Sequence, residues 1–266
     1  MIRTLHRWPG LLALALVTIL SLSGAALSVF PAVERITAPQ VETGLTVATL
    51  VDGIQAVYPG VEQIRRSPSG RITAYWFDQG APGAAVIDPA TGAGVASADP
   101  NQALRWLTNL HRSLFLGDGG RITMAAGAAA MLVLSLSGAV LVARRAGGWR
   151  NWFAPLRGPF AGRLHVEIAR IAVIGLVLSS TTALWMTAST FDLLPDGGAI
   201  PAMPTEVSGE TGFPLDQMAT LLQTPVAELR ELSFPYPGDA TDVFTLKTDR
   251  GTGYLDQGTG ALVAWA

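Results

Sequence analysis

The chain has 266 residues, of which 49% are hydrophobic and 14% are charged, and its net charge is −2. A soluble globular domain usually carries about 25% charged residues, so the composition excludes an ordinary soluble protein. It contains no cysteine, which excludes disulfides, thiolate metal ligands and thiol nucleophiles. We expect a lipid bilayer as its surroundings and no nucleic acid as a partner.

Three uncharged apolar runs, 11–30, 122–143 and 171–191, account for this composition. Each is long enough, at about 1.5 Å per helical residue, to cross a hydrocarbon core of about 30 Å. We therefore predict transmembrane helices over 10–30, 122–143 and 166–191. The first run exceeds the usual length of a signal-peptide core, so we interpret it as an uncleaved anchor.

Arginines predict the orientation of these helices. The segment 144–163 contains five arginines and no acidic residue, which favours a cytoplasmic basic loop under the positive-inside rule. The N-terminal segment 1–9 is then also cytoplasmic, and the stretches 38–110 and 205–266 lie outside. The chain is thus expected to be a multi-pass membrane protein with a cytoplasmic N-terminus.

The two outer stretches resemble copies of one unit. Asp88 and Gly92 in "AVIDPATGAGVA" match Asp256 and Gly260 in "GYLDQGTGALVA". Both motifs predict a tight turn in which the glycine has positive φ. The aspartates are more easily explained as turn residues than as catalytic ones.

Each copy predicts one helix followed by a small antiparallel sheet. Helical patterns occupy 46–57 and 215–222, and strand patterns occupy 70–77 and 242–247. The expected fold class is an α+β membrane protein: a bundle of three transmembrane helices with two small extracytoplasmic α/β domains, each a helix plus an antiparallel sheet.

The apolar runs also repeat a motif of small residues. "LSLSGA" occurs at 20–25 and again at 134–139, and "LVLSSTTAL" occurs at 176–184. Small residues allow helices to approach closely, and their hydroxyls can bond across a bundle. Packing is the simpler interpretation, and the lining of a site for a flat ligand is the alternative.

Together these motifs resemble the family of PepSY domains carried on PepSY-associated transmembrane helices. The segments that carry the resemblance are "LHRWPGL" with "LSLSGAAL", "LHRSLFLGDGGR" with "LSLSGAVL", and "DPATGAGV" and "DQGTGALV" beside "VYPG". The resemblance implies a bacterial inner-membrane protein with PepSY-like domains. It also implies a relation to ferrisiderophore reductases, some of which hold b-type haems between four helices. Some family members are fused to flavodoxin-like and ferredoxin-reductase-like modules, but this sequence has no glycine-rich dinucleotide fingerprint.

The chain has three histidines, and each lies near the end of an apolar run. Imidazole is the usual axial ligand of a haem held in a helical bundle. His6 and His165 are expected at the same cytoplasmic level, where they could bind one haem b, and His111 is expected at the outer level. Candidates for pairing with haem propionates are Arg7, Arg112 and Arg170, and Glu167 is a candidate partner for Arg170. The alternative is that these histidines and arginines only anchor the helices at the membrane surface.

The repeat also predicts a counterpart of His111 at about position 279, beyond Ala266. We therefore expect this sequence to be a truncated or split form of a longer protein with a fourth span.

Two functions remain open from the sequence. The first is a transmembrane electron-transfer subunit, a possible membrane oxidoreductase. It would move electrons from a cytoplasmic flavoprotein reductase, separate or fused, to an extracytoplasmic ferric chelate or protein. FMN, FAD or NADPH would then be bound only by a partner or a missing C-terminal module. The second is a non-redox module that docks on a peptidase or envelope protein.

Overall fold

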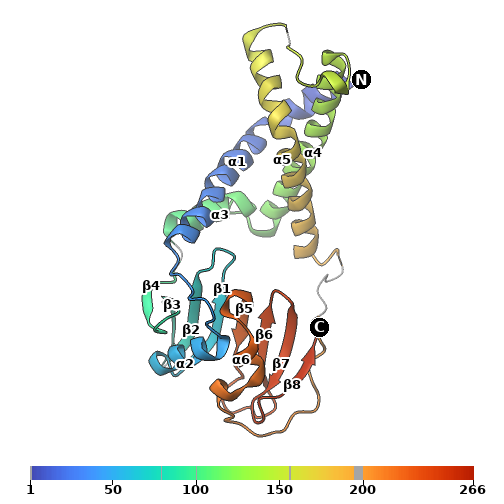
Figure 1. The fold of residues 1–266 in the computed structure, drawn as a ribbon. Coiled ribbons are helices and arrows are strands. Elements are labelled where there is room, and N and C mark those ends of the chain that lie inside the picture. The colour runs from blue at the N-terminus through green and yellow to red at the C-terminus, as the bar shows by residue number, and fades with distance from the viewer. Residues whose placement is uncertain (1, 79, 100, 156, 195–199) are drawn as a thin grey trace. The chain divides into compact units, whose positions relative to one another are not determined.

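The computed structural model describes residues 2–78, 80–99, 101–155, 157–194 and 200–266. The chain forms two compact units (Figure 1). The helical unit comprises Met1–Ser28 with Gln102–Gly197, and the sheet unit comprises Val29–Asn101 with Gly198–Ala266.

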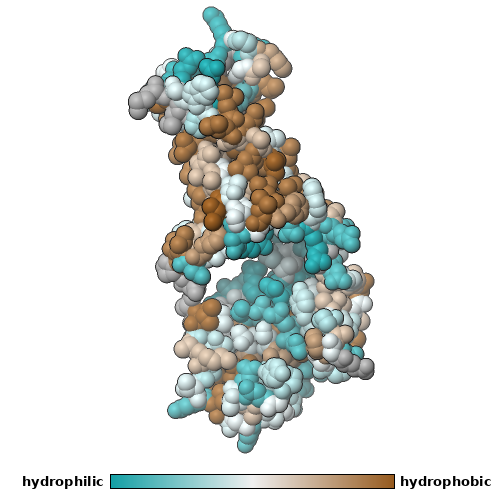
Figure 2. Space-filling view, turned by 180° about the vertical axis from the view of Figure 1, so that it is seen from behind, coloured by the Kyte–Doolittle hydropathy of each residue, from teal (hydrophilic) through white to brown (hydrophobic). Residues whose placement is uncertain are grey.

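Three long apolar helices dominate the helical unit: α1 (Ile2–Thr37), α4 (Gly117–Ala146) and α5 (Phe160–Thr190). Each is long and apolar enough to cross a membrane, which confirms the prediction of three candidate spans. Figure 2 shows that apolar residues cover much of the visible face of this unit. The helices extend beyond their apolar runs. Helix α1, for example, begins at Ile2, whereas the sequence predicted a separate N-terminal segment of nine residues.

A shorter helix, α3 (Gln102–Ser113), precedes α4 and packs against it. The sequence placed residues up to 110 in the first outer domain, whereas the structure groups the chain from Gln102 onward with the helices. The connection after α3 is tight, since Leu114 and Phe115 have φ values of 49° and 62°. Non-glycine residues seldom adopt such values, so packing must hold this turn. Between α4 and α5 lies the short 3-10 helix η1 (Trp149–Asn151).

The sheet unit contains one antiparallel sheet of eight strands in the order β4-β3-β2-β1-β5-β6-β7-β8. The first half supplies the strands β1 (Val61–Arg66), β2 (Ile72–Asp78), β3 (Ala81–Ile87) and β4 (Gly94–Ser97). The second half supplies β5 (Leu229–Ser233), β6 (Val243–Thr248), β7 (Gly251–Asp256) and β8 (Leu262–Trp265). The sequence predicted two separate small sheets, and the structure instead joins the two halves through the β1–β5 pair.

The helices of both halves cover one face of this sheet (Figure 1). They are α2 (Val47–Val57), η2 (Leu215–Gln217), α6 (Ala219–Gln223) and η3 (Val226–Glu228). Helix α2 begins where predicted, because the Thr46 hydroxyl accepts a hydrogen bond from the Thr49 amide.

A single hydrophobic core extends across both halves. At its centre, Ile64 of β1 pairs in register with Leu232 of β5, and neither side chain is exposed. On the opposite face of the sheet, the Glu231 carboxylate contacts Lys247 at 2.7 Å and Arg65 at 3.2 Å. A half of about 60 residues buries a small core by itself, so joining the halves increases the apolar surface that each can bury.

The two halves have a similar order of elements, and the turn between β3 and β4 matches the turn between β7 and β8. The Asp88 carbonyl accepts a 2.9 Å hydrogen bond from the Gly92 amide, and Asp256 does the same for Gly260. The two glycines have φ values of 71° and 69°. Asp88 and Asp256 therefore shape equivalent turns.

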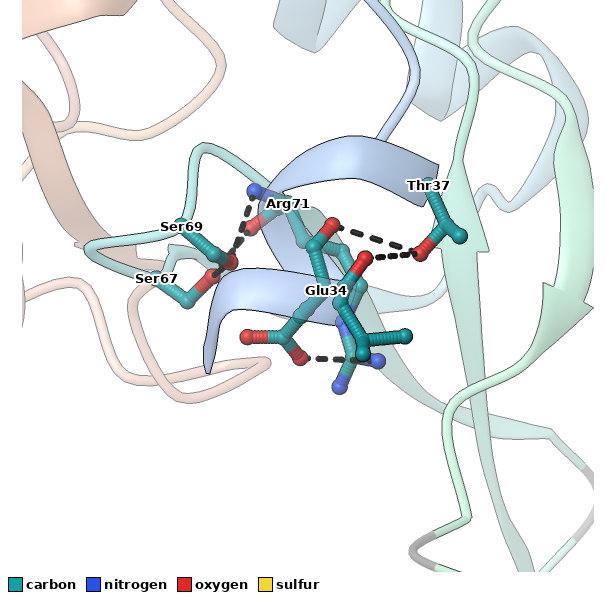
Figure 3. Close-up of polar contacts among 6 residues, drawn as sticks. Glu34, Thr37, Ser67, Ser69 and Arg71 are labelled. Atoms are coloured by element: carbon teal, nitrogen blue, oxygen red, sulfur yellow. Dashed lines mark hydrogen bonds and ion pairs between the residues drawn. The ribbon is translucent and has the colours of Figure 1, made fainter. Parts of the chain in front are cut away.

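The last turns of α1 lie within the sheet unit and bind the β1–β2 turn (Figure 3). The Arg71 guanidinium forms a 2.9 Å ion pair with Glu34, and the hydroxyls of Ser67 and Ser69 lie 2.5 Å apart within the turn. Arg35 donates a further hydrogen bond to the Pro68 carbonyl. These polar contacts hold the end of α1 against this turn.

Candidate functional site

His6 and His165 lie together in the helical unit. His6 is on the second turn of α1 and His165 is on the second turn of α5, so two segments far apart in sequence meet here. Their ring centres are 6.4 Å apart, and the ring planes are inclined by 65°. Because both helices begin at this end of the bundle, the structure brings together the pair expected from the sequence.

Both imidazoles line a cavity of about 1210 Å³ between α1, α4 and α5. Its inner wall is formed by apolar side chains and by small residues of α4, including Ser135, Gly138 and Ala139. Small residues at this position keep the cavity open where larger ones would fill it.

Four arginines also line this cavity: Arg3, Arg7, Arg144 and Arg145. Guanidinium groups form strong, often bidentate hydrogen bonds with carboxylates and phosphates. The cavity therefore combines an apolar wall, two imidazoles and a cationic rim, which suits a flat apolar ligand with acidic substituents.

The spacing of the imidazoles fits a shared metal ion. With metal–nitrogen bonds of roughly 2 Å, the centres of two rings on opposite sides of one ion lie about 6 Å apart, close to the 6.4 Å observed. Within the described residues, no group of three or more His, Cys, Asp or Glu side chains could hold a metal. Two imidazoles at this spacing fit an ion whose remaining ligands belong to a cofactor, as in haem.

The His6 ring rests on a Ser-Gly pair of α4. The Ser137 hydroxyl lies 3.0 Å from His6 Nδ1. A Cβ added to Gly138 would lie 3.1 Å from His6 Cε1, so glycine allows the ring to approach the helix backbone. The sequence indicated these two residues only as packing residues or as part of a lining.

His111 lies elsewhere in the unit, on α3, and rests on an equivalent Ser-Gly pair of α1. The Ser23 hydroxyl lies 2.8 Å from His111 Nδ1, and a Cβ on Gly24 would lie 3.1 Å from His111 Cε1. Ser23 follows His6 by 17 residues of helix, which corresponds to about 26 Å along α1. The two histidine positions are thus separated by nearly the thickness of a hydrocarbon core.

The position of His111 depends on close packing at the start of α4. A Cβ on Gly120 would overlap the backbone of Ser113, the last residue of α3. Glycine at 120 therefore allows α3 to fold back against α4 after the strained turn at Leu114 and Phe115.

The predicted arginines have different surroundings. Arg7 lines the cavity, and Arg112 is exposed on α3 beside His111. Arg170 is buried, with its guanidinium bonded to the Glu167 carboxylate at 2.9 and 3.0 Å and to the Ala154 carbonyl at 2.8 Å. Arg170 therefore joins α5 to the loop before it.

Sequence reasoning counted three arginines as orientation signals and did not assign them to the site: Arg3, Arg144 and Arg145. Their positions in the chain could have suggested this role, because each lies near the predicted cytoplasmic end of an apolar run, as His6 and His165 do.

Comparison with known proteins gives one result. The family model described as "PepSY-associated TM region" matches residues 3–258. This match includes all of the histidines and arginines named above, and both histidine positions with their Ser-Gly pairs. No curated protein and no solved structure matches the chain.

Proposed function

Because this chain belongs to the PepSY-associated transmembrane family, we propose that it is a membrane electron-transfer protein that holds b-type haem between His6 and His165. The observation that supports the proposal is the pair of imidazoles in one cavity, at the spacing that a shared iron requires. Bound haem would supply reversible one-electron chemistry at this position.

The protein's own residues have separate roles in this proposal. His6 and His165 provide the axial ligands from two different helices. The apolar wall would limit the access of water, and arginines of the cationic rim, Arg3, Arg7 and Arg144, would pair with the acidic substituents of the cofactor. Arg170 supports the site indirectly, since its contacts with Glu167 and Ala154 hold the start of α5.

A second haem position at His111 is part of the proposal. Its support is the Ser-Gly pair under the ring, which repeats the arrangement beside His6. The other two histidines of this sequence lie at the opposite end of α1 from Ser23. A second histidine ligand for iron at His111 would therefore come from outside this sequence.

The proposed direction of transfer follows the positive-inside rule. The loop 144–163 carries five arginines and no acid, so we place it and His6 in or near the cytoplasm of a bacterium and the sheet unit outside. Electrons would pass from a cytoplasmic flavoprotein reductase to an extracytoplasmic acceptor such as a ferric siderophore. Reporter fusions after residue 150 and after residue 266 test this orientation, and a cytoplasmic signal from the second fusion contradicts it.

Absorption spectroscopy tests the haem proposal directly. The protein purified in detergent after expression with haem supply should give a sharp reduced-minus-oxidised b-type band. His6→Ala and His165→Ala should each abolish the band of the shared haem, whereas His111→Ala should retain it as the matched control. A colourless wild-type preparation, or full haem content in either of the first two variants, contradicts the proposal and favours a non-redox docking module.

A further inference from the structure

We propose that Ser137 and Ser23 hold His6 and His111 as the tautomer protonated on Nδ1, so that Nε2 is the nitrogen presented to a metal. The inference rests on the proposed function for the role of the metal, but the tautomer itself is a property of the chain alone. Ser137 and Ser23 are thus positioning residues that act through the histidines.

The first step concerns the single proton of each serine hydroxyl. The Ser23 hydroxyl lies 2.6 Å from the Ile19 carbonyl, and the Ser137 hydroxyl lies 3.2 Å from the Leu134 carbonyl. A carbonyl oxygen only accepts hydrogen bonds, so each of these contacts, when formed as a hydrogen bond, uses the one proton of the serine hydroxyl.

The second step fixes the proton of the imidazole. Each hydroxyl oxygen also lies within hydrogen-bond distance of an Nδ1, at 3.0 Å for His6 and 2.8 Å for His111. With the serine proton donated to the carbonyl, as we propose, the serine oxygen accepts from the imidazole, and Nδ1 carries the hydrogen. A neutral imidazole has one N–H, which leaves the lone pair on Nε2 free to bind a metal.

The third step concerns the glycine that follows each serine. The Cε1 atoms of His6 and His111 lie between the two ring nitrogens and approach Gly138 and Gly24 respectively. A methyl group at 3.1 Å is tighter than an ordinary van der Waals contact, so alanine at either position would push the ring away from its serine. The serine thus determines which ring nitrogen carries the proton, and the glycine determines how closely the ring approaches that serine.

The same arrangement occurs twice, once with the serine on α4 and once with the serine on α1. The Ser-Gly pair of α4 supports the histidine of α1, and the pair of α1 supports the histidine that precedes α4. The third small-residue run is different. The Ser180 hydroxyl also donates to a carbonyl of its own helix, that of Leu176, but its described hydrogen bonds include none to a histidine. Two of the three runs therefore orient a histidine, beyond providing close packing.

A hydroxyl acceptor has a defined effect on the ligand. A neutral serine oxygen fixes the ring as a carboxylate would, but it withdraws the Nδ1 proton less and raises the basicity of Nε2 less. Loss of the hydroxyl should weaken metal binding about tenfold, the lower end of the effect of removing such partners. It should also raise the midpoint potential, since a less basic imidazole stabilises the ferric state less.

The first test uses haem-free protein. Nitrogen-15 NMR of histidine-labelled full chain in lipid nanodiscs, with signals assigned by single histidine variants, should show His6 protonated on Nδ1. Ser137→Ala should give a mixture of tautomers, Ser137→Thr should restore the wild-type state because it retains the hydroxyl, and Ser180→Ala should change nothing. An Nε2-protonated His6 in the wild type, or no change in Ser137→Ala, overturns the proposal.

The second test uses protein reconstituted with haem. Ser137→Ala should bind haem about tenfold more weakly, with a higher midpoint potential, and Ser137→Thr should recover both values. Gly138→Ala should lose affinity although its serine is intact. If haem binds but Ser137→Ala leaves both values unchanged, the positioning role fails while the proposed function stands. If the expected tautomer is found but no haem binds, the proposed function fails and the tautomer assignment stands.

Discussion

Asp256 accepts an unusual number of hydrogen bonds for one carboxylate. It is nearly fully buried, and its oxygens accept from the Ser208 amide and hydroxyl at 2.6 and 2.7 Å. They also accept from the Gly258 amide and from the Thr259 amide and hydroxyl at 2.9, 2.9 and 3.1 Å. The carboxylate of Asp88, its counterpart in the first half, accepts only from the Ala90 amide and the Thr91 hydroxyl among the described contacts.

Replacement of Asp256 by asparagine should destabilise the sheet unit by about 2–4 kcal/mol. The NH₂ group of the introduced side chain would face one of the donors on Ser208, which leaves a buried donor unpaired, and the remaining hydrogen bonds would lose their charge assistance. Asp88→Asn is the matched control, and we expect a loss of less than about 1 kcal/mol because it has fewer and more exposed contacts.

Hydrogen exchange of the full chain in detergent provides the assay, since it reports the sheet strands separately from the helices. The slowest amides of β6 and β7 exchange through unfolding of the whole unit. They should exchange roughly 30- to 700-fold faster in Asp256→Asn, at tenfold per 1.4 kcal/mol. Equal rates in Asp256→Asn and Asp88→Asn would refute the reasoning.

The destabilisation caused by Asp256→Asn should decrease at acid pH. Burial raises the pKa of the Asp256 carboxyl, but the hydrogen bonds from Ser208, Gly258 and Thr259 outweigh burial and hold that pKa far below its ordinary value. A lowered pKa in the folded state stabilises the protein fully above the unfolded pKa of about 3.9, and this contribution is lost as the pH falls below it. The difference in the free energy of unfolding between wild type and Asp256→Asn should therefore have its full value at pH 7 and decrease steadily below about pH 4.

Three further predictions concern other parts of the chain. Leu232→Ala should cost about 2–5 kcal/mol and speed exchange in both halves of the sheet, because the core is shared; a change confined to β5–β8 would contradict this. Gly92→Ala should destabilise well beyond the ~1 kcal/mol expected for Gly44→Ala, since both have positive φ but only at Gly92 would a Cβ overlap backbone; denaturant unfolding compares them. Glu167→Gln should lower the thermal stability of the helical unit by about 1–2 kcal/mol, because it removes the charge that pairs with a buried arginine; an unchanged melting temperature in detergent would show that Ala154 alone suffices.

Local features of the fold could be predicted from the sequence. The three long helices follow from uncharged runs, and the turn at Gly92 and Gly260 follows from the Asp and Gly spacing. The Glu167–Arg170 pair, three residues apart on one helix, was also predicted and is present. Each depends on interactions within a few residues, where sequence patterns are informative.

Long-range features could not be predicted from one sequence. The β1–β5 pair joins residues such as Gln63 and Ser233, which are 170 positions apart, and nothing local selects one eight-stranded sheet over two smaller ones. The contacts of Ser137 with His6 depend likewise on how far α4 is shifted along α1. The motif "LSLSG" shows that small residues meet a neighbour, but not which side chain they meet.

The distance in sequence between His6 and its neighbours has a consequence for biogenesis. Its supporting serine follows 131 residues later, and His165 follows 159 residues later, by the difference of their numbers. At a synthesis rate of about 5–20 residues per second, the pocket lacks one imidazole for roughly 8–30 s after His6 is made. Under the proposed function, haem would therefore be bound by both histidines only after α5 has been made, and a ribosome-bound chain arrested before α5 should capture no haem at His6.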